Sequence, residues 1–437
     1  MNDRVWQAKL AAWTHDPAEK ALVLLRDPAG HEGGTVRALR EILFHGGLPD
    51  GVGTLVKRAD HWAAAADRPQ WPQVKGMPWL DQVRFYRHPV LIHPLSGKPF
   101  ELKGRLDEVE VEAIKEASFE QFEALIDPDS DSRRTALAFW RFGPERAPEG
   151  LGALWGRLPA DTRVPDHSIW SHLDLTAAFA TAMAADPKGV PALLVVSLGP
   201  VQGFIVQARS TSDLWAGSHL LSRMAWEGIK VVASDLGPDQ LLFPQLRGIA
   251  EVDLWLRDEV GLSREWFAEQ PWASMRSDAN PLFSAALPNR FVAIVPAGEA
   301  EKIARRIEGA VRGWVREQGR ETLRNLLEVA GVVADEDLPC HAQLEAQLAG
   351  FPEVHWAVVP WSLAAGGDGG VDTTGIEALL RRLYPDGEGA PGFLGQDAWK
   401  VLSEPIDCDG VQFFRPNPGV LYPALYDALD RLAAAAK

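Results

Sequence analysis

Histidine and aspartate side chains recur in the first half of the chain, and both bind divalent metal ions. They are grouped in four stretches: His15-Asp16, Asp60-His61, Asp166-His167 and His172-Leu-Asp174. Helical bundles build metal sites from imidazoles and carboxylates that separate helices bring to their interior. One or two ions held in this way activate water and neutralise the charge of a phosphodiester. The stretches therefore indicate a candidate centre for phosphodiester hydrolysis.

A helix cap is the alternative interpretation of two of these stretches. Asp16 is followed by Pro17 and Glu19, which is typical of a helix N-terminus with a capping aspartate, a first-turn proline and a capping-box acid. Asp166 fits the same role for the helix that follows it. Taken alone, the heptapeptide THDPAEK favours the cap over the ligand.

The other two ligand candidates have structural alternatives as well. A lone Asp60 is more often a surface partner of Arg58 or Lys57, and a lone His172 on an apolar stripe is more often a hydrogen-bonded core histidine. The complete set favours metal binding, because a His-Asp dyad, a helical Asp and a His on a third helix match an HD-type phosphohydrolase. The lone His comes last in the sequence, which predicts a circularly permuted helix order.

Further residues are weaker candidates for the same centre. His31, His61 and His167 are auxiliary candidates that could lie beside the metal ligands or contact a substrate phosphate. Lys20, one helical turn after Asp16, could bind a phosphate as a point charge and join the catalytic set. A solvated lysine is an equally good interpretation of Lys20.

Composition limits the class of protein and the kind of metal site. With 437 residues and 46% hydrophobic content, the chain can form two or three soluble domains. It has no run of about 18 apolar residues and no signal-peptide core, so we expect a cytoplasmic protein without membrane contact. Cys340 and Cys408 form no CxxC pair, so a metal must use His and carboxylates. A net charge of -16 argues against nonspecific wrapping of nucleic acid.

Hydrophobic periodicity divides the chain into two parts and predicts an α+β fold. Residues 5–186 show helical periodicity, which predicts an all-helical domain at 1–187. The second part, 188–437, alternates strands and helices and ends in a helix at 422–436. Its strands and long helices are predicted, in order, at 191–198, 201–234, 240–246, 289–296, 299–328 and 354–360. This β-α-β-β-α-β order is typical of ferredoxin-like and palm domains.

The most specific stretch is VVSLGPVQGFIVQARSTSDLWAGSHLLSRMAW, at 195–226. It resembles the large subunit of type III CRISPR effector complexes, in particular the type III-B or Cmr form. Five other stretches resemble segments of that family in the same order: HDPAEKAL, ADHWAAAADR, DTRVPDHSIWSH, LPNRFVAIVP and RPNPGVLYPALYDAL. The resemblance covers nearly the whole chain.

The resemblance implies an activity for the first domain. In the family, a permuted HD domain is a metal-dependent nuclease for single-stranded DNA that uses Mn, Ni or Mg. Carried over by position, the ligands fall on His15, Asp16, Asp60 and His172. A scaffold whose HD site has decayed and a free-standing HD phosphohydrolase acting on nucleotides are the alternative hypotheses.

The resemblance also implies a role for the second domain. Paired palms of the family make cyclic oligoadenylate from ATP when target RNA is bound, using a Gly-Gly-Asp-Asp hairpin in the second palm. The first palm here has no acid in Ser197-Leu198-Gly199, so we expect it to be non-catalytic, and AAGGDGGVD at 364–372 is predicted to be a loop. The residues expected near ATP are Gly199, Pro200, Val201, Gln202 and Ser218. A plain strand-helix turn is the alternative.

The family further implies partners and a longer protein. Expected partners are the other Cmr subunits, and crRNA and target RNA through the complex, in antiviral defence. The family's cysteine-rich zinc element and second palm are not found in the sequence, so we expect an N-terminal portion or a truncated form.

Overall fold

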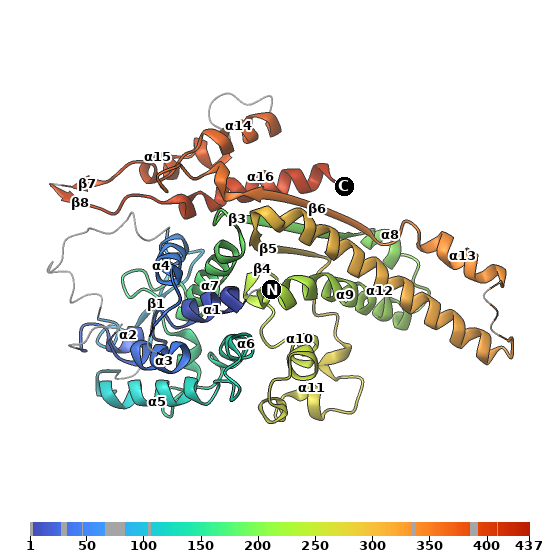
Figure 1. Cartoon of the computed structure of the whole chain (residues 1–437), viewed down its shortest axis with the longest axis horizontal. Helices are drawn as coiled ribbons and strands as arrows, with labels where there is room; N and C mark the ends of the chain where they lie inside the picture. The colour runs from blue at the N-terminus through green and yellow to red at the C-terminus, as the bar shows by residue number, and fades with distance from the viewer. Residues whose placement is uncertain are drawn as a thin grey trace.

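The computed structural model describes the chain except for nine short stretches. The described residues are 3–27, 33–45, 47–65, 84–103, 106–333, 335, 337–384, 392–408 and 410–437. Figure 1 shows a helical region on the left and, on the right, a sheet with long helices. No helix among the described residues is long and apolar enough to cross a bilayer.

The first part of the chain is mainly helical. Its helices are α1 (Asp3–Trp13), α2 (Lys20–Val23), α3 (Thr35–Phe44), α4 (Val52–Ala63), α5 (Val111–Glu123), α6 (Ser132–Phe142) and α7 (Ile169–Ala185). The prediction of an all-helical domain is wrong in one detail, because β1 (Val90–Ile92) pairs with β2 (Pro99–Glu101) in an antiparallel hairpin. The turn between these strands places Gly97 at a φ of 65°, which a glycine adopts without strain.

Neither predicted aspartate cap is present. Helix α2 begins only at Lys20, with Glu19 in the cap position and no side-chain cap hydrogen bond. Helix α7 is capped by Ser168, whose hydroxyl accepts a hydrogen bond from the backbone N–H of Ser171. The capping interpretation of Asp16 and Asp166 is therefore wrong, and the two carboxylates contact Lys20 and His167 instead.

The second part contains a four-stranded antiparallel sheet. Its strands are β3 (Pro191–Gly199), β4 (Leu241–Phe243), β5 (Arg290–Pro296) and β6 (Glu353–Pro360), in the spatial order β4-β5-β3-β6. With the long helices α9 (Thr211–Leu236) and α12 (Ala300–Val329), the predicted order of strands and helices is confirmed, as is the α+β class. Strand β4 is shorter than predicted, since Pro244 follows it and offers no N–H to a neighbouring strand.

Helices cover both faces of this sheet (Figure 1). Every residue of β3 up to Leu198 is buried, which requires cover on both faces. Helices α9 and α12 pack against each other and on the sheet, and α7 and α16 (Tyr422–Ala435) contact its central strands. Smaller elements complete this part: α8 (Val201–Ile205), α10 (Ala250–Trp255), α11 (Pro271–Ser274), α13 (Pro339–Leu348), η10 (Trp361–Leu363), α14 (Thr374–Leu383), α15 (Asp397–Leu402), β7 (Asp407–Cys408), β8 (Val411–Gln412) and η12 (Pro418–Leu421).

The connection from α7 to β3 is held by one carboxylate. Asp186 Oδ1 accepts hydrogen bonds from the backbone N–H groups of Lys188 and Val190, at 2.8 and 3.0 Å. Its Oδ2 accepts one from the N–H of Gly298, at 2.7 Å, at the start of the segment leading into α12. The two parts of the chain therefore meet at a fixed junction.

Buried ion pairs also join the two parts. Arg141 on α6 donates from Nε and Nη2 to the two carboxylate oxygens of Asp253 on α10, at 2.5 and 2.8 Å, and both residues are fully buried. Lys9 on α1 pairs with Asp239 in a second, equally buried contact. Such pairs hold charges that water no longer solvates, so each partner depends on the other.

Loss of Asp253 tests this coupling. We expect Asp253→Ala to lower the free energy of unfolding by about 3–5 kcal/mol, because it leaves the buried Arg141 guanidinium with only the partly exposed Glu145 as a carboxylate partner. The measurement is denaturant unfolding of the full chain. The control is Asp397→Ala, which removes an exposed partner of Lys400 and should cost less than about 1 kcal/mol. Equal costs for the two variants would contradict the coupling.

Candidate metal centre

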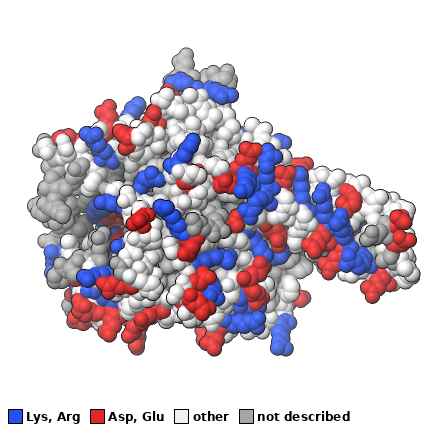
Figure 2. All heavy atoms as spheres, in the orientation of Figure 1, with Lys and Arg blue, Asp and Glu red and all other residues white. Residues whose placement is uncertain are grey.

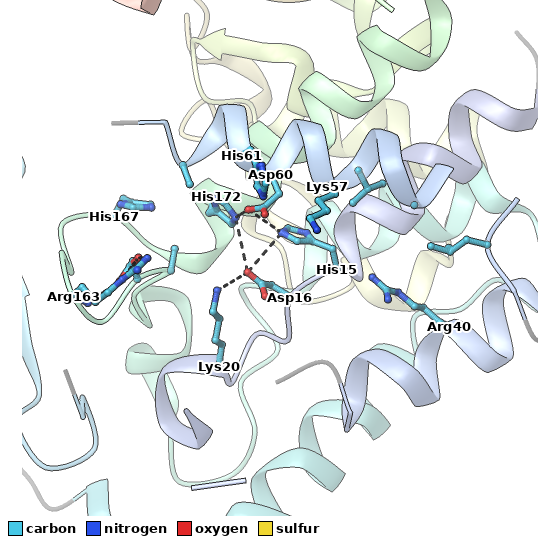
Figure 3. A pocket seen from close by; sticks show the side chains of 16 residues that line it. His15, Asp16, Lys20, Arg40, Lys57, Asp60, His61, Arg163, His167 and His172 are labelled. Carbon is cyan, nitrogen blue, oxygen red and sulfur yellow. Dashed lines mark hydrogen bonds and ion pairs between the residues drawn. The ribbon is translucent and has the colours of Figure 1, made fainter. Parts of the chain in front are cut away.

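Three separate elements bring the predicted ligands into one cavity of about 500 Å³. His15 and Asp16 lie in the turn between α1 and α2, Asp60 lies in the last turn of α4, and His172 lies in the first turn of α7. Figure 3 shows their side chains pointing toward one another. The complete lining is His15, Asp16, Lys20, Arg40, Leu48, Gly53, Val56, Lys57, Asp60, His61, Ala64, Ala160, Asp161, Arg163, His167 and His172.

The distances within this set are within about 0.3 Å of those expected around a tetrahedral metal ion. His172 Nε2 lies 3.2 Å from Asp60 Oδ1 and 3.9 Å from Asp16 Oδ2. His15 Nε2 lies 3.8 Å from Asp60 Oδ1 and 3.6 Å from Asp16 Oδ2. Ligand atoms about 2.0–2.2 Å from a tetrahedral ion are about 3.3–3.6 Å apart. His15, Asp60 and His172 thus form a possible metal-binding triad, with Asp16 beside it.

The backbone fixes which nitrogen of His15 faces the cavity. Its Nδ1 is 2.6 Å from the carbonyl oxygen of Ala12, and because a carbonyl only accepts, Nδ1 must carry the proton. In the neutral ring Nε2 is then a bare acceptor, and this buried atom has no hydrogen-bond partner among the described residues. A metal ion would satisfy it, so the residues present fit a divalent cation.

Electrostatics keep both carboxylates ionised. Burial by itself would raise the pKa of Asp16, but the Lys20 ammonium, at 2.7 Å, and the two imidazoles hold that pKa well below its usual range. Burial likewise opposes ionisation of Asp60, and its contacts with His15 and His172 outweigh burial, so its pKa is also lowered.

The two imidazoles have pKa values shifted in opposite directions. Burial disfavours the charged form of His15, yet the carboxylates of Asp16 and Asp60 raise the pKa of His15 above its ordinary value. Burial lowers the pKa of His172, and the nearby His15 lowers it further. The centre therefore offers two carboxylates and a neutral His172 imidazole, the form in which each of these groups binds metal.

Two of the three auxiliary histidine candidates line the cavity. His61 and His167 line the cavity, and His167 Nδ1 is 2.7 Å from Asp166 Oδ1. His31 lies outside the described residues. Lys20 lines the cavity too, with its ammonium bonded to Asp16.

Sequence reasoning missed several polar residues on the cavity wall. They are Arg40, Lys57, Asp161 and Arg163. Lys57 precedes Asp60 by three residues on α4, a spacing that places both on one side of a helix. This spacing could have identified Lys57. The interpretation of Asp60 as a surface partner of Arg58 is wrong, because Arg58 donates to the carbonyl of Gly189 instead.

The predicted nucleotide-binding residues lie far along the chain from this cavity and do not line it. Gly199 ends β3, Pro200 takes the cap position of the five-residue helix α8, and Val201 and Gln202 form its first turn. Ser218 is on α9, where its hydroxyl donates to the carbonyl of Leu214. A role for these residues in binding ATP stays a prediction.

Comparison with known proteins shows which proteins this chain resembles. Residues 193–325 match the family described as CRISPR-associated protein Cmr2, N-terminal. The CRISPR system Cmr subunit Cmr2 of Pyrococcus furiosus is 27% identical over 402 residues, which cover 81% of this chain and 42% of that protein. The chain is thus similar to Cmr2, and the family match, over 193–325, is to the N-terminal part of Cmr2. A Cmr2 from Saccharolobus solfataricus is 39% identical over 100 residues, covering 22% of this chain and 9% of that protein.

Solved structures show the same fold. The cryo-EM structure of Type III-B Cmr-beta in the apo state matches with a TM-score of 0.61 at 20% identity, covering 87% of this chain and 40% of that chain. Type III-B Cmr-beta bound to cognate target RNA matches with a TM-score of 0.58 at 20% identity, covering 87% and 39%. At this identity the two structures show a shared fold, in agreement with the similarity to Cmr2. The chain spans about two fifths of the length of the Pyrococcus relative.

Metal binding by this centre can be measured directly. We expect the full chain to bind Mn²⁺ in calorimetric titration, and Asp60→Asn or His172→Ala to weaken binding at least tenfold, because the first removes the charge of a ligand and the second removes a ligand atom. Asp166→Asn is the matched control, since it removes a neighbouring acid that does not line the cavity. Unchanged affinity in both ligand variants would place the ion elsewhere.

Proposed function

We propose that the chain is the nuclease-bearing part of a type III-B large subunit, with an HD-type domain that cleaves single-stranded DNA. The observation that carries the proposal is the convergence of His15, Asp16, Asp60 and His172 in one open cavity. The relation to Cmr2 supports a role in RNA-guided antiviral defence, within a complex of other Cmr subunits, crRNA and target RNA. The ion is Mn, Ni or Mg.

The protein's own residues prepare the centre for hydrolysis. When bound, a divalent ion supplies Lewis-acid chemistry that withdraws charge from a phosphodiester and makes water more acidic. Ala12 holds His15 with Nε2 directed into the cavity, and Lys20 holds Asp16 ionised and oriented. Lys20 thereby acts on the centre through Asp16, and its proposed place in the catalytic set rests on that contact.

The distribution of charge supports an anionic substrate at this cavity. Lys57 lies on the cavity wall beside His15 in Figure 3, and its ammonium makes no hydrogen bond or ion pair with another described residue. Elsewhere acidic side chains gather on the surface over α5, at the lower left of Figure 2, where Glu112, Glu116 and Glu120 are exposed. A DNA strand is repelled from that face and attracted to the cavity wall.

We assign the sheet and its helices, 188–437, to a ferredoxin-like palm without catalytic carboxylates. The spatial order β4-β5-β3-β6 with antiparallel pairing supports this assignment. In this proposal the palm contributes structure and a nucleotide-binding surface, and the helical part, 1–187, contributes the hydrolytic centre.

A scaffold with an inactive HD site is the second candidate function. The observation that favours a docking role is the projection of α12 and α13 beyond the body of the molecule (Figure 1), where Leu326, Val329 and Val333 are exposed. Apolar side chains at the tip of a projection suit contact with a neighbouring subunit. A chain that binds its ion and cleaves DNA could still dock in this way.

Nuclease activity is the first test of the proposal. We expect the purified full chain to degrade single-stranded DNA with Mn²⁺, Ni²⁺ or Mg²⁺, and EDTA to abolish the activity. The double variant His15→Ala, Asp16→Ala loses two ligands and should be at least 100-fold slower. Equal rates in the parent and this variant would refute the HD assignment and leave the scaffold.

Lys57 provides a test of the substrate. In the background of His15→Ala and Asp16→Ala, where DNA stays intact, we expect Lys57→Ala to weaken oligonucleotide binding in fluorescence anisotropy. The slope of log affinity against log salt should shrink by about 0.7, the value for one phosphate contact on a single strand. Arg37→Ala is the control, because Arg37 lies one turn before Arg40 but is paired with Glu41 on the surface. An unchanged slope for Lys57→Ala would remove it from the binding surface.

A further inference from the structure

The chain returns from the palm to the metal centre shortly before its last helix. Residues 415–421 lead into α16 and contact α4, the helix that carries Asp60 (Figure 1). Asn417 Nδ2 donates a hydrogen bond of 2.7 Å to the carbonyl oxygen of His61. The donor and acceptor are 356 residues apart in the sequence.

This hydrogen bond reaches a carbonyl in the last turn of α4. The last four carbonyls of a helix have no regular partner inside it. Beyond the end of α4, the N–H of Ala64 bonds to Asp60 and the N–H of Ala65 turns back to Trp62, so the carbonyl of His61 gets its donor from the Asn417 amide. Asn417 therefore caps α4 from another part of the molecule.

Close packing of Gly419 against the end of α4 also holds the segment in place. Asn417 Oδ1 accepts the N–H of Gly419 at 2.9 Å, which folds the segment against α4. A Cβ on Gly419 would overlap the carbonyl oxygen of Trp62 and lie 2.8 Å from the Cβ of Ala65, so only glycine fits. The backbone of the segment thus lies directly on the backbone of the helix end.

Trp361 also contacts the segment 415–421. Its indole Nε1 donates to the carbonyl of Pro418 at 3.1 Å, and it is completely buried. Its ring contacts Trp62 on α4 and Phe179 on α7, with centroid distances of 6.1 and 5.0 Å. The side chain thus ties the helices that carry Asp60 and His172 to the end of β6.

We propose that Asn417 and Gly419 are positioning residues for the metal centre, and that the segment 415–421 clamps the end of α4 so that Asp60 faces His15 and His172. The inference rests on the proposed metal site. Metal geometry tolerates displacements of only about 0.5 Å, and residues that hold ligands in place commonly change metal affinity 10–100-fold. Since the segment continues into α16, which packs on β3 and β6, the palm sets the position of Asp60.

Asn417→Asp is the most informative variant. Aspartate retains the oxygen that accepts the N–H of Gly419 but lacks the N–H that reaches His61. Its added negative charge would strengthen cation binding at long range, which is opposite to the expected effect. Gly419→Ala tests the steric contact independently.

Two matched controls separate positioning from stability. Asn280 makes the same kind of turn, accepting the N–H of Leu282 while its amide donates to the carbonyls of Trp272 and Met275, so Asn280→Asp is the same change outside the clamp. Gly309→Ala adds a methyl group where nothing lies within 4 Å of it.

The experiment measures Mn²⁺ affinity by calorimetry and hydrogen exchange of the α4 amides in the ion-free full chain. We expect Asn417→Asp and Gly419→Ala to weaken Mn²⁺ binding at least tenfold and to speed exchange in 59–65, while the controls leave both unchanged. Parent-like affinity and exchange in Asn417→Asp would overturn the clamp, as would equal losses in Asn280→Asp. If the parent binds no Mn²⁺, the metal site fails, and exchange in 59–65 alone decides whether the segment holds α4.

Discussion

The packing of helix α7 on two sides is the constraint on which the rest of the structure depends. Most of its residues are buried, because it contacts α1 and α4 on one side and strands β3 and β5 on the other. A helix that is apolar on nearly all sides is stable only when it is enclosed. Its first turn supplies His172 and its last residues lead into β3, so one helix joins the candidate metal centre to the core of the sheet.

Removing the carboxylates of the metal centre from water costs free energy, and the charged groups beside them offset that cost. Burial takes hydration from Asp16, which is buried, and from Asp60, which is half-buried, and so opposes their ionisation. Lys20 compensates Asp16 directly, and His15 and His172 face Asp60. A bound divalent cation would stabilise the ionised carboxylates further, and a cluster of groups with shifted pKa values is typical of a functional site.

The sequence indicated which ligand candidates lie together better than it indicated the details around them. His15, Asp16, Asp60 and His172 were identified from residue type, helix spacing and family order, and they converge. The caps at Asp16 and Asp166 were wrong, because a cap motif is local and the packing of α1, α4 and α7 turns both carboxylates elsewhere. The hairpin of β1 and β2 was missed, since two strands of three residues leave almost no periodicity.

Contacts across long stretches of sequence were beyond prediction. Nothing near Asn417 or Trp361 indicates a contact with α4, and nothing near Arg141 indicates Asp253. These pairs depend on how the helical part lies on the sheet, which is fixed by shape and burial rather than by any local pattern. Lys57 is the opposite case, because its three-residue spacing from Asp60 was visible in the sequence.

The Asp186 carboxylate determines what kind of motion can link the two parts. Three backbone N–H groups are bound to one side chain, which restrains the connection between α7 and β3 against acting as a hinge. Relative movement must then take the form of shear, a small sliding of packed helices over the sheet. Sliding by a fraction of an ångström leaves the overall shape of the molecule unchanged. It is nevertheless comparable to the ligand displacement that metal binding tolerates.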